Sequence, residues 1–157
     1  MRWLALATFV VLLDQASKAW VLASFRYLES VAVTPFFNLV LVYNSGAAFS
    51  FLAGAGGWQK WFFVILALGI SAWLLSLLRQ HAGERLLPLA LSLILGGASG
   101  NVIDRLRFDA VVDFLDFHLA GYHWPAFNVA DSAITVGVVL MLWHQFRFGK
   151  ETETGTQ

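Results

Sequence analysis

Residues Leu86 to Ile103, LLPLALSLILGGASGNVI, form a run of 18 uncharged residues bounded by Arg85 and Asp104. An α-helix of about 20 apolar residues spans the hydrocarbon core of a bilayer, where its backbone satisfies its own hydrogen bonds. This run therefore predicts a membrane-spanning helix. The stretch from Trp61 to Leu78 is again 18 uncharged residues long and predicts a second one.

Each end of the chain predicts one more spanning helix. From Ser132 to Phe146 there are 15 uncharged residues, and the preceding turn from Asn128 brings this segment to spanning length. Near the N-terminus, Trp3 to Leu13 supplies only 11 uncharged residues, so a span must carry Asp14 and Lys18 towards its far end. We expect an all-α membrane protein with four transmembrane helices, covering about 3–22, 60–79, 85–104 and 128–147.

The composition agrees with lipid as the main solvent of this chain. Of its 157 residues, 59% are apolar and 13% charged, whereas soluble domains are about half apolar and a quarter charged. Lys plus Arg and Asp plus Glu both total 10, so no basic footprint exists for a nucleic-acid partner. The absence of Cys excludes disulfides and thiolate metal sites, and no His-Glu-x-x-His spacing occurs. Neither a metal nor a cofactor is expected.

The longest uncharged stretch, Ser30 to Gln59, does not predict a fifth span. Pro35 and several Asn and Gly residues interrupt it, while Phe37 to Tyr43 is rich in β-branched and aromatic residues. This pattern predicts strands joined by glycine turns on the membrane surface. With four spans, both connecting segments, about 23–59 and 105–127, lie on one side of the membrane. Lys and Arg number five on each side, so the positive-inside rule does not orient the chain.

Acidic residues gather on the side of the connecting segments. Carboxylates at the mouth of a helix bundle are energetically unfavourable, so they suggest function. Two carboxyls that share one proton can hydrolyse a peptide, because one donates to the scissile carbonyl while the other accepts a proton from water. Simpler roles stay open, since Asp131 can complete a helix cap with Asn128, and the run Asp109 to Asp116 can be a solvated face. The acidic residues on this side are Asp14, Glu29, Asp104, Asp109, Asp113, Asp116 and Asp131.

Two other function classes are possible. The string Gly97-Ala98-Ser99-Gly100 is like the one around the nucleophile of rhomboid-type intramembrane serine proteases. These proteases need a His at matching depth, but His144 is 13 residues beyond Asp131, roughly 20 Å along a helix. A non-enzymatic small transporter or bundle subunit would need an acidic residue deep in the two middle helices, which have none. The spacing Gly96-x-x-x-Gly100 itself predicts close helix packing.

The charged residues at the helix ends suggest local pairs. Asp14 and Lys18 are four residues apart with the acid first, which favours an ion pair along one helix face. Asp104 and Arg105 are most simply paired with each other. Arg2 and the short apolar run before Ser17-Lys18-Ala19 imitate a cleaved secretory signal peptide, although an Asp14–Lys18 pair favours a retained helix.

Set side by side, these segments resemble the bacterial lipoprotein signal peptidases, signal peptidase II. Five strings carry the resemblance, in the expected order and over nearly the whole chain. They are Asp14-Gln15-Ala16-Ser17-Lys18, Tyr43-Asn44-Ser45-Gly46-Ala47-Ala48-Phe49-Ser50, Gly97-Ala98-Ser99-Gly100-Asn101-Val102-Ile103-Asp104-Arg105, Val111-Val112-Asp113-Phe114 and Phe127-Asn128-Val129-Ala130-Asp131-Ser132-Ala133.

The resemblance implies a multi-pass aspartic endopeptidase of the bacterial inner (cytoplasmic) membrane. It would remove signal peptides from diacylglyceryl-modified prolipoproteins, cleaving before the lipidated Cys, with membrane lipids as further partners. Residues 1–150 would form one peptidase domain, a monomer, followed by a polar tail over 151–157. The first helix would be retained, both termini would be cytoplasmic, and the β-rich segment and the acidic mouth would be extracytoplasmic, facing the periplasm or outer face.

The same resemblance implies residue roles. The catalytic dyad would be Asp113 and Asp131. The residues lining the substrate site would be Asn44, Gly46, Asn101, Arg105 and Asn128. The structural supports would be Asp14, Lys18 and Asp104. The strand pattern and glycine content of Ser30 to Gly57 suit a further role, that of a surface cradle and glycine-hinged flap over the substrate.

Overall fold

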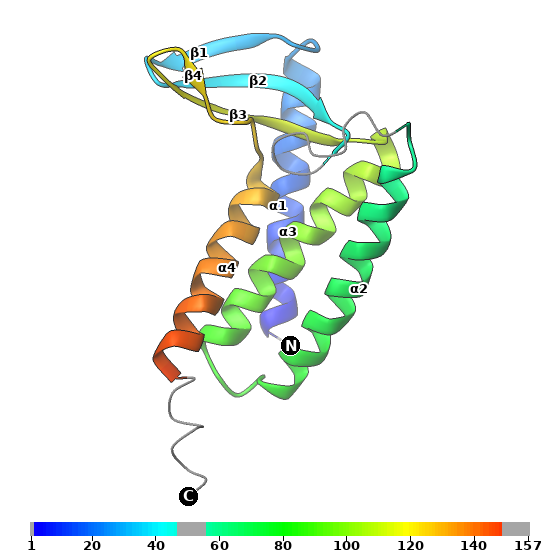
Figure 1. Ribbon diagram of the computed structural model, residues 1–157, viewed down its shortest axis with the longest axis vertical. Coiled ribbons are helices and arrows are strands. Elements are labelled where there is room, and N and C mark those ends of the chain that lie inside the picture. The colour runs from blue at the N-terminus through cyan, green and yellow to red at the C-terminus, as the bar shows by residue number, and fades with distance from the viewer. Residues whose placement is uncertain (1, 47–55, 149–157) are drawn as a thin grey trace, which may run out of the picture.

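Four long helices and a small sheet make up the fold (Figure 1). The computed structural model describes residues 2–46 and 56–148. The helices are α1 (Arg2–Ser24), α2 (Gln59–Gln80), α3 (Leu86–Phe108) and α4 (Val129–Phe148). All four are long and apolar enough to cross a membrane, which confirms the expected spans. The tail over 151–157 and positions 47–55 of the expected cradle and flap lie outside the described residues.

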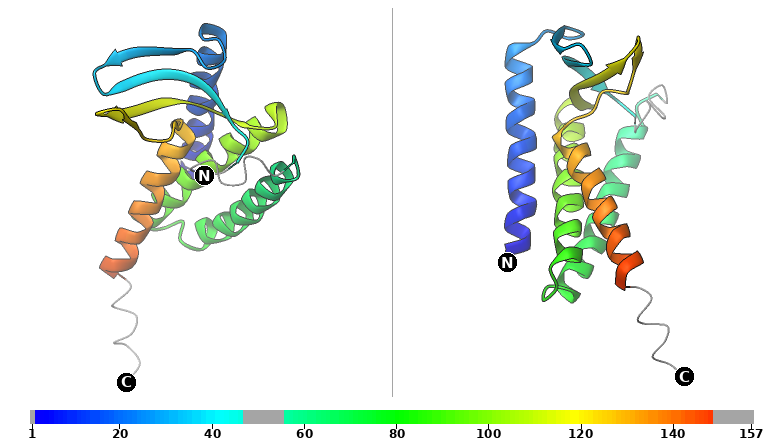
Figure 2. Two further views of the ribbon diagram at one scale, coloured as in Figure 1. Left: turned by 45° about the horizontal axis from the view of Figure 1, so that its top comes forward. Right: turned by 90° about the vertical axis from the view of Figure 1, so that its left-hand side faces the viewer.

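The two connecting segments build one antiparallel sheet. Its strands are β1 (Ser30–Thr34), β2 (Phe37–Asn44), β3 (Val111–Leu119) and β4 (Tyr122–His123), in that order. The central pairing joins the two segments, because β2 runs antiparallel to β3, with Asn44 opposite Val111. The sheet lies across one end of the bundle, while the N-terminus lies near the other end, where α4 also finishes (Figure 2). The prediction of strands in the first segment is confirmed.

The helix α3 is the central element of the bundle and packs against the other three helices. Within the membrane-spanning part of α3, 61% of the residues are buried inside the protein, compared with 17% for α2 and 11% for α4. Glycines allow the close approach, since a Cβ atom at Gly96 would meet Ala7 and Val10 of α1, and one at Gly97 would meet Ala130 and Ile134 of α4. The apolar surfaces of α2 and α4 point outwards, as they must if lipid is their solvent.

A small apolar cluster fixes the sheet on the bundle. Val112 and Phe114 of β3 pack with Leu41 of β2 against Val21 near the end of α1. Because side chains alternate along a strand, Asp113 lies on the opposite face from Val112 and Phe114. The cluster therefore determines where the Asp113 carboxyl points.

Candidate active site

The predicted catalytic residues Asp113 and Asp131 line the same pocket. This pocket has a volume of about 890 Å³ and lies between β2, β3, the chain before α4, and the helices α3 and α4. Asp113 is the third residue of β3, whereas Asp131 belongs to the first turn of α4. Three residues predicted to bind substrate line it as well, namely Asn44, Asn101 and Arg105. Its apolar walls include Trp124, Phe127, Ile134 and Val136.

Asn128 connects the two carboxyl-bearing residues. Its buried amide nitrogen donates to Asp113 Oδ1 at 2.7 Å, and its Oδ1 accepts the backbone N–H of Asp131 at 2.9 Å. The second bond is that of a helix N-cap, as the sequence predicted. The Asp131 carboxyl does not complete a reciprocal capping box, because its Oδ1 accepts a hydrogen bond from the Asn101 amide at 2.8 Å. Asp131 thus has its side chain on the pocket.

Amide donors surround both carboxyls. Asp113 accepts a second hydrogen bond, from Asn44 Nδ2 to its Oδ2 at 3.3 Å. Burial of Asp113 and the nearby negative charge of Asp131 raise its pKa to about 7, although the hydrogen bonds from Asn128 and Asn44 work in the opposite direction. Asp113 can therefore hold a proton close to neutral pH.

Arg105 lines the pocket and does not pair with Asp104. Its Nη2 donates to the carbonyl of Gly46 at 2.9 Å, and its guanidinium carbon lies 5.0 Å from the centre of the Phe63 ring. The Nε atom of Arg105 is buried and has no hydrogen-bond partner among residues 2–46 and 56–148. The prediction of an Asp104–Arg105 ion pair is wrong, because Lys18 binds Asp104 Oδ2 at 2.7 Å instead. Successive helix residues diverge by about 100°, so neighbours in sequence point to different surroundings.

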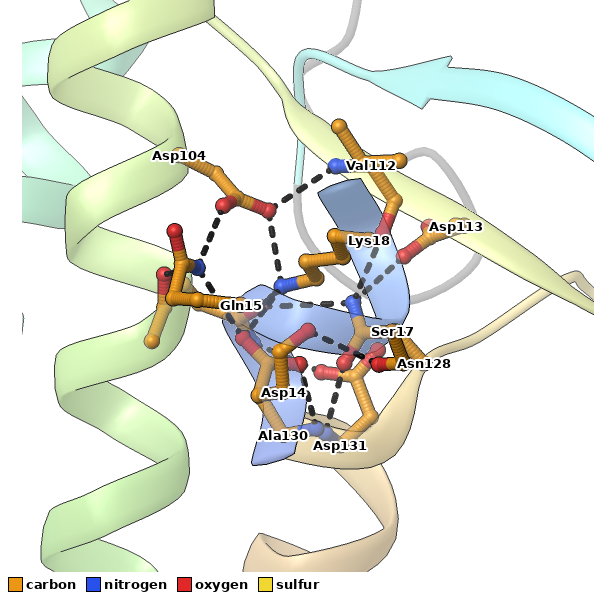
Figure 3. Close-up of polar contacts among 12 residues, drawn as sticks. Asp14, Gln15, Ser17, Lys18, Asp104, Val112, Asp113, Asn128, Ala130 and Asp131 are labelled. Atoms are coloured by element: carbon orange, nitrogen blue, oxygen red, sulfur yellow. Dashed lines mark hydrogen bonds and ion pairs between the residues drawn. The ribbon is translucent and has the colours of Figure 1, made fainter. Parts of the chain in front are cut away.

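A buried polar network lies beneath the pocket (Figure 3). The predicted pair of Asp14 and Lys18 is present, with Nζ 2.9 Å from Asp14 Oδ2. Sequence reasoning did not single out Gln15, although it stands in the first matching string. Its amide donates to Asp104 Oδ1 at 2.8 Å and to Asp14 Oδ2 at 3.2 Å.

The remaining acidic residues of β3 and its flank lie elsewhere. Asp116 is three residues from Asp113, so it projects from the other face of the strand, where it contacts Asn38 and His123. Although burial opposes it, the hydrogen bonds from His123 and Asn38 hold the pKa of Asp116 below its ordinary value. Asp109 is exposed and pairs with Lys60. The two additional carboxyls are therefore not part of the pocket.

The geometry does not support the serine alternative. The Ser99 hydroxyl donates to the Leu95 carbonyl of its own helix at 2.8 Å. His144 lies 3.2 Å from Glu84, which belongs to the turn between α2 and α3 at the opposite end of the bundle from the sheet.

The role of Asp14 as a support leads to a prediction. Asp14 is fully buried, and its Oδ1 accepts the Ala130 N–H at 2.9 Å. The change Asp14→Asn should lower the free energy of unfolding by about 3 kcal/mol, the lower end of the cost of breaking a buried ion pair, since Lys18 keeps Asp104 as a partner. Some activity should survive in the folded fraction. Thermal unfolding in detergent and a cleavage assay on the same sample measure both effects.

A matched control is Glu29→Gln, because the Glu29 carboxylate accepts a backbone N–H at an exposed position and should matter little. An Asp14→Asn protein as stable as the wild type but without any activity would instead place Asp14 among the catalytic groups.

Comparison with solved structures first defines the class of protein. One chain described as a bacterial membrane enzyme, determined by the in meso method at 2.3 Å resolution, has a TM-score of 0.83 and 34% identity. The match covers 99% of this chain and 92% of that chain. A second structure with the same description, at 1.9 Å resolution, has a TM-score of 0.81 and covers 94% of both chains. The architecture is thus that of a bacterial membrane enzyme.

Comparison with sequences then identifies the family. A sequence model of the family described as signal peptidase (SPase) II matches residues 6–147. The lipoprotein signal peptidase of Azoarcus sp. (strain BH72) is 63% identical over 148 residues, which are 94% of this chain and 84% of the relative. That of Cupriavidus taiwanensis is 61% identical over 92% of this chain and 82% of the relative. The chain belongs to the signal peptidase II family and is a membrane peptidase. The serine protease and transporter alternatives are not supported.

Proposed function

We propose that Asp113 and Asp131 are the catalytic dyad with which this peptidase cleaves diacylglyceryl-modified prolipoproteins before the lipidated Cys. As a member of the signal peptidase II family, the chain removes signal peptides from lipoprotein precursors. The observation that supports this dyad is that both carboxyls line one pocket and are joined through the single buried amide of Asn128.

The mechanism needs one protonated and one ionised carboxyl. Asp113, whose pKa is raised to about 7, holds the proton, and Asp131 is the base. Asp131 accepts a proton from a water molecule, which attacks the carbonyl carbon before the lipidated Cys. Asp113 donates its proton to the carbonyl oxygen. The tetrahedral gem-diol intermediate then collapses: the C–N bond breaks, the amine of the Cys leaves with a proton from Asp131, and one hydroxyl of the intermediate returns its proton to Asp113 as the new carboxyl forms.

The polar groups around the dyad divide into two sets. Asn101 donates to the Asp131 carboxyl and Asn128 to the Asp113 carboxyl. Their role is therefore to orient the dyad, and they affect the substrate only through it. Arg105 donates to the Gly46 carbonyl, and its buried Nε has no partner in the part of the chain that the structure describes. This donor suits a substrate carbonyl oxygen or a lipid ester. The apolar wall formed by Trp124, Ile134 and Val136 suits the apolar part of the precursor.

The proposed placement is a monomer in the bacterial inner membrane, with the sheet and the pocket facing the periplasm or outer face. Both termini are then cytoplasmic. Support comes from the sheet, which closes one end of the bundle, and from the N-terminus and the end of α4, which lie away from it (Figure 2). The first helix is retained, because Asp14 and Lys18 bind groups that adjoin the dyad.

The pH dependence of turnover tests the assignment of the proton to Asp113. We expect kcat to fall as the pH rises through about 7, because Asp113 then loses the proton that it donates. The change Asn44→Ala removes a hydrogen bond that favours the ionised form of Asp113, so it should move this alkaline limb to higher pH. The measurement is cleavage of a diacylglyceryl-modified precursor by purified enzyme across neutral pH. A flat profile on both sides of neutrality would contradict the proposal.

A further inference from the structure

Lys18 lies at the centre of the buried network and uses all three of its N–H donors. The side chain is 2% exposed. Its Nζ atom is 2.9 Å from Asp14 Oδ2, 2.7 Å from Asp104 Oδ2 and 3.1 Å from Asn101 Oδ1. An ammonium group has three N–H donors, and here each one has its own acceptor. Lys18 therefore holds the three acceptor side chains at a fixed distance from one another.

Each of the two carboxylates bound by Lys18 also binds the backbone next to one dyad residue. Asp14 Oδ1 accepts the N–H of Ala130 at 2.9 Å, and Ala130 directly precedes Asp131. Asp104 Oδ2 accepts the N–H of Val112 at 3.1 Å, and Val112 directly precedes Asp113. Figure 3 shows the Lys18 ammonium between these two carboxylates. The start of α4 and the start of β3 are thus tied to one cation.

The third acceptor connects Lys18 to a dyad side chain. Asn101 presents its oxygen to Lys18 and to Asn128 Nδ2, and its amide nitrogen donates to Asp131 Oδ1. An Asn side chain can rotate by half a turn and exchange its oxygen and nitrogen. The ammonium opposes that rotation, because the amide nitrogen would then face a positive charge. Lys18 therefore selects the orientation in which Asn101 donates to Asp131.

We propose that Lys18 is a positioning residue for catalysis: through Asp14, Asp104 and Asn101 it determines the spacing and the hydrogen-bonding of Asp113 and Asp131. This inference rests on the proposed dyad and goes beyond a role in stability. Lys18 does not line the pocket, so it positions the dyad through its three partners.

Lys18 also sets the charge around the dyad. Four carboxyls surround this core, two beside Lys18 and two at the pocket, and the guanidinium of Arg105 lies near them. Removal of the ammonium takes away a positive charge that favours the ionised form of Asp113. Loss of the proton from Asp113 should then require a higher pH, which is the direction in which the alkaline limb of the activity profile should move.

The test is Lys18→Met, which keeps an unbranched side chain of similar length but has no charge and no donor. We expect kcat to fall about 10²-fold, with KM within about 3-fold of the wild-type value, because the displaced groups act on the reacting atoms and not on the bound precursor. The alkaline limb should move upwards as well. A Lys18→Met enzyme with wild-type kcat and an unshifted limb would overturn the proposal, whatever its thermal stability.

Two further variants make the test specific. Lys60→Met removes a less buried lysine, which pairs with the exposed Asp109 away from the dyad, and it should leave kcat and the pH profile unchanged. If Lys18→Met alone does not fold, Lys18→Met with Asp104→Asn removes one of the two carboxylates that lose their cation and still offers an oxygen to the Val112 N–H. This double variant should fold and keep the lowered kcat, because Asn101 still lacks its ammonium donor. Full kcat in the folded double variant would overturn the proposal.

The proposed dyad is tested separately on the same precursor with Asp113→Asn. An active Asp113→Asn enzyme would refute the dyad itself. An inactive Asp113→Asn enzyme beside a fully active Lys18→Met enzyme would refute only the positioning role.

Discussion

Asp113→Asn and Asp131→Asn are each expected to abolish detectable cleavage of a diacylglyceryl-modified precursor. Each change removes a group that must donate or accept a proton, and such groups contribute about 10²–10⁴-fold to the rate. The double variant should be little worse than either single one, since residues that act as a unit have non-additive effects. Turnover of purified protein, followed by separation of precursor and product, measures the loss.

The fold should survive the change at position 113. Since the pKa of Asp113 in the fold is raised to about 7, its ionisation destabilises the protein as the pH rises from the ordinary carboxyl range towards 7. A neutral Asn avoids that penalty, so thermal unfolding above neutral pH should not occur at a lower temperature than in the wild type.

Asp116→Asn is the matched control for the dyad variants. Asp116 belongs to the same strand but faces Asn38 and His123, away from the pocket. Its loss should leave turnover close to the wild-type rate. Near-normal cleavage by Asp113→Asn or by Asp131→Asn would sink the dyad assignment.

A precursor without its diacylglyceryl group is expected to be cleaved far less efficiently than the lipidated form. Each buried acyl CH₂ contributes about 0.8 kcal/mol to membrane partition, so two acyl chains hold the cleavage site at the depth of the helix ends. An unlipidated precursor must bring its scissile bond there unaided. We expect kcat/KM to fall by more than about 10²-fold, more than the loss of any one side-chain contact should cause.

The two precursors should be compared in one detergent or bilayer system, with the same enzyme preparation. The apolar pocket wall includes Ile134 and Val136, which belong to α4. Most of the membrane-spanning part of α4 faces outwards from the bundle, so the pocket wall and this outer surface belong to one helix. Under the proposed function, acyl chains would reach the dyad from the lipid along this surface. Equal cleavage of both precursors would contradict the proposed lipid requirement and leave an aspartic membrane peptidase of other specificity.

The sequence by itself determined the features that depend on neighbouring residues. Uncharged runs such as Leu86 to Ile103 required helices, because a backbone in lipid must satisfy its own hydrogen bonds. The i,i+4 spacing of Asp14 and Lys18 gave their ion pair, and Asn128 three residues before Asp131 gave the helix cap. Such contacts are short in sequence, so a local pattern specifies both partners.

The identity of the dyad was less local. From spacing alone, Asp131 could be a capping residue and Asp113 part of a solvated face, and resemblance to a family was needed to single them out. The structure places both on one pocket, but their roles remain a prediction that the variants above must test.

Only the tertiary structure decided the contacts between distant segments. The β2–β3 pairing brings Asn44 within hydrogen-bond distance of Asp113. The packing of α1 on α3 makes Lys18 the ion-pair partner of Asp104, although Arg105 is the neighbour of Asp104 in sequence. A buried carboxylate pairs with the cation that helix packing places within hydrogen-bond distance. The next residue along the same helix points about 100° away, so it is not that partner. No spacing in the sequence encodes which helix will supply that cation.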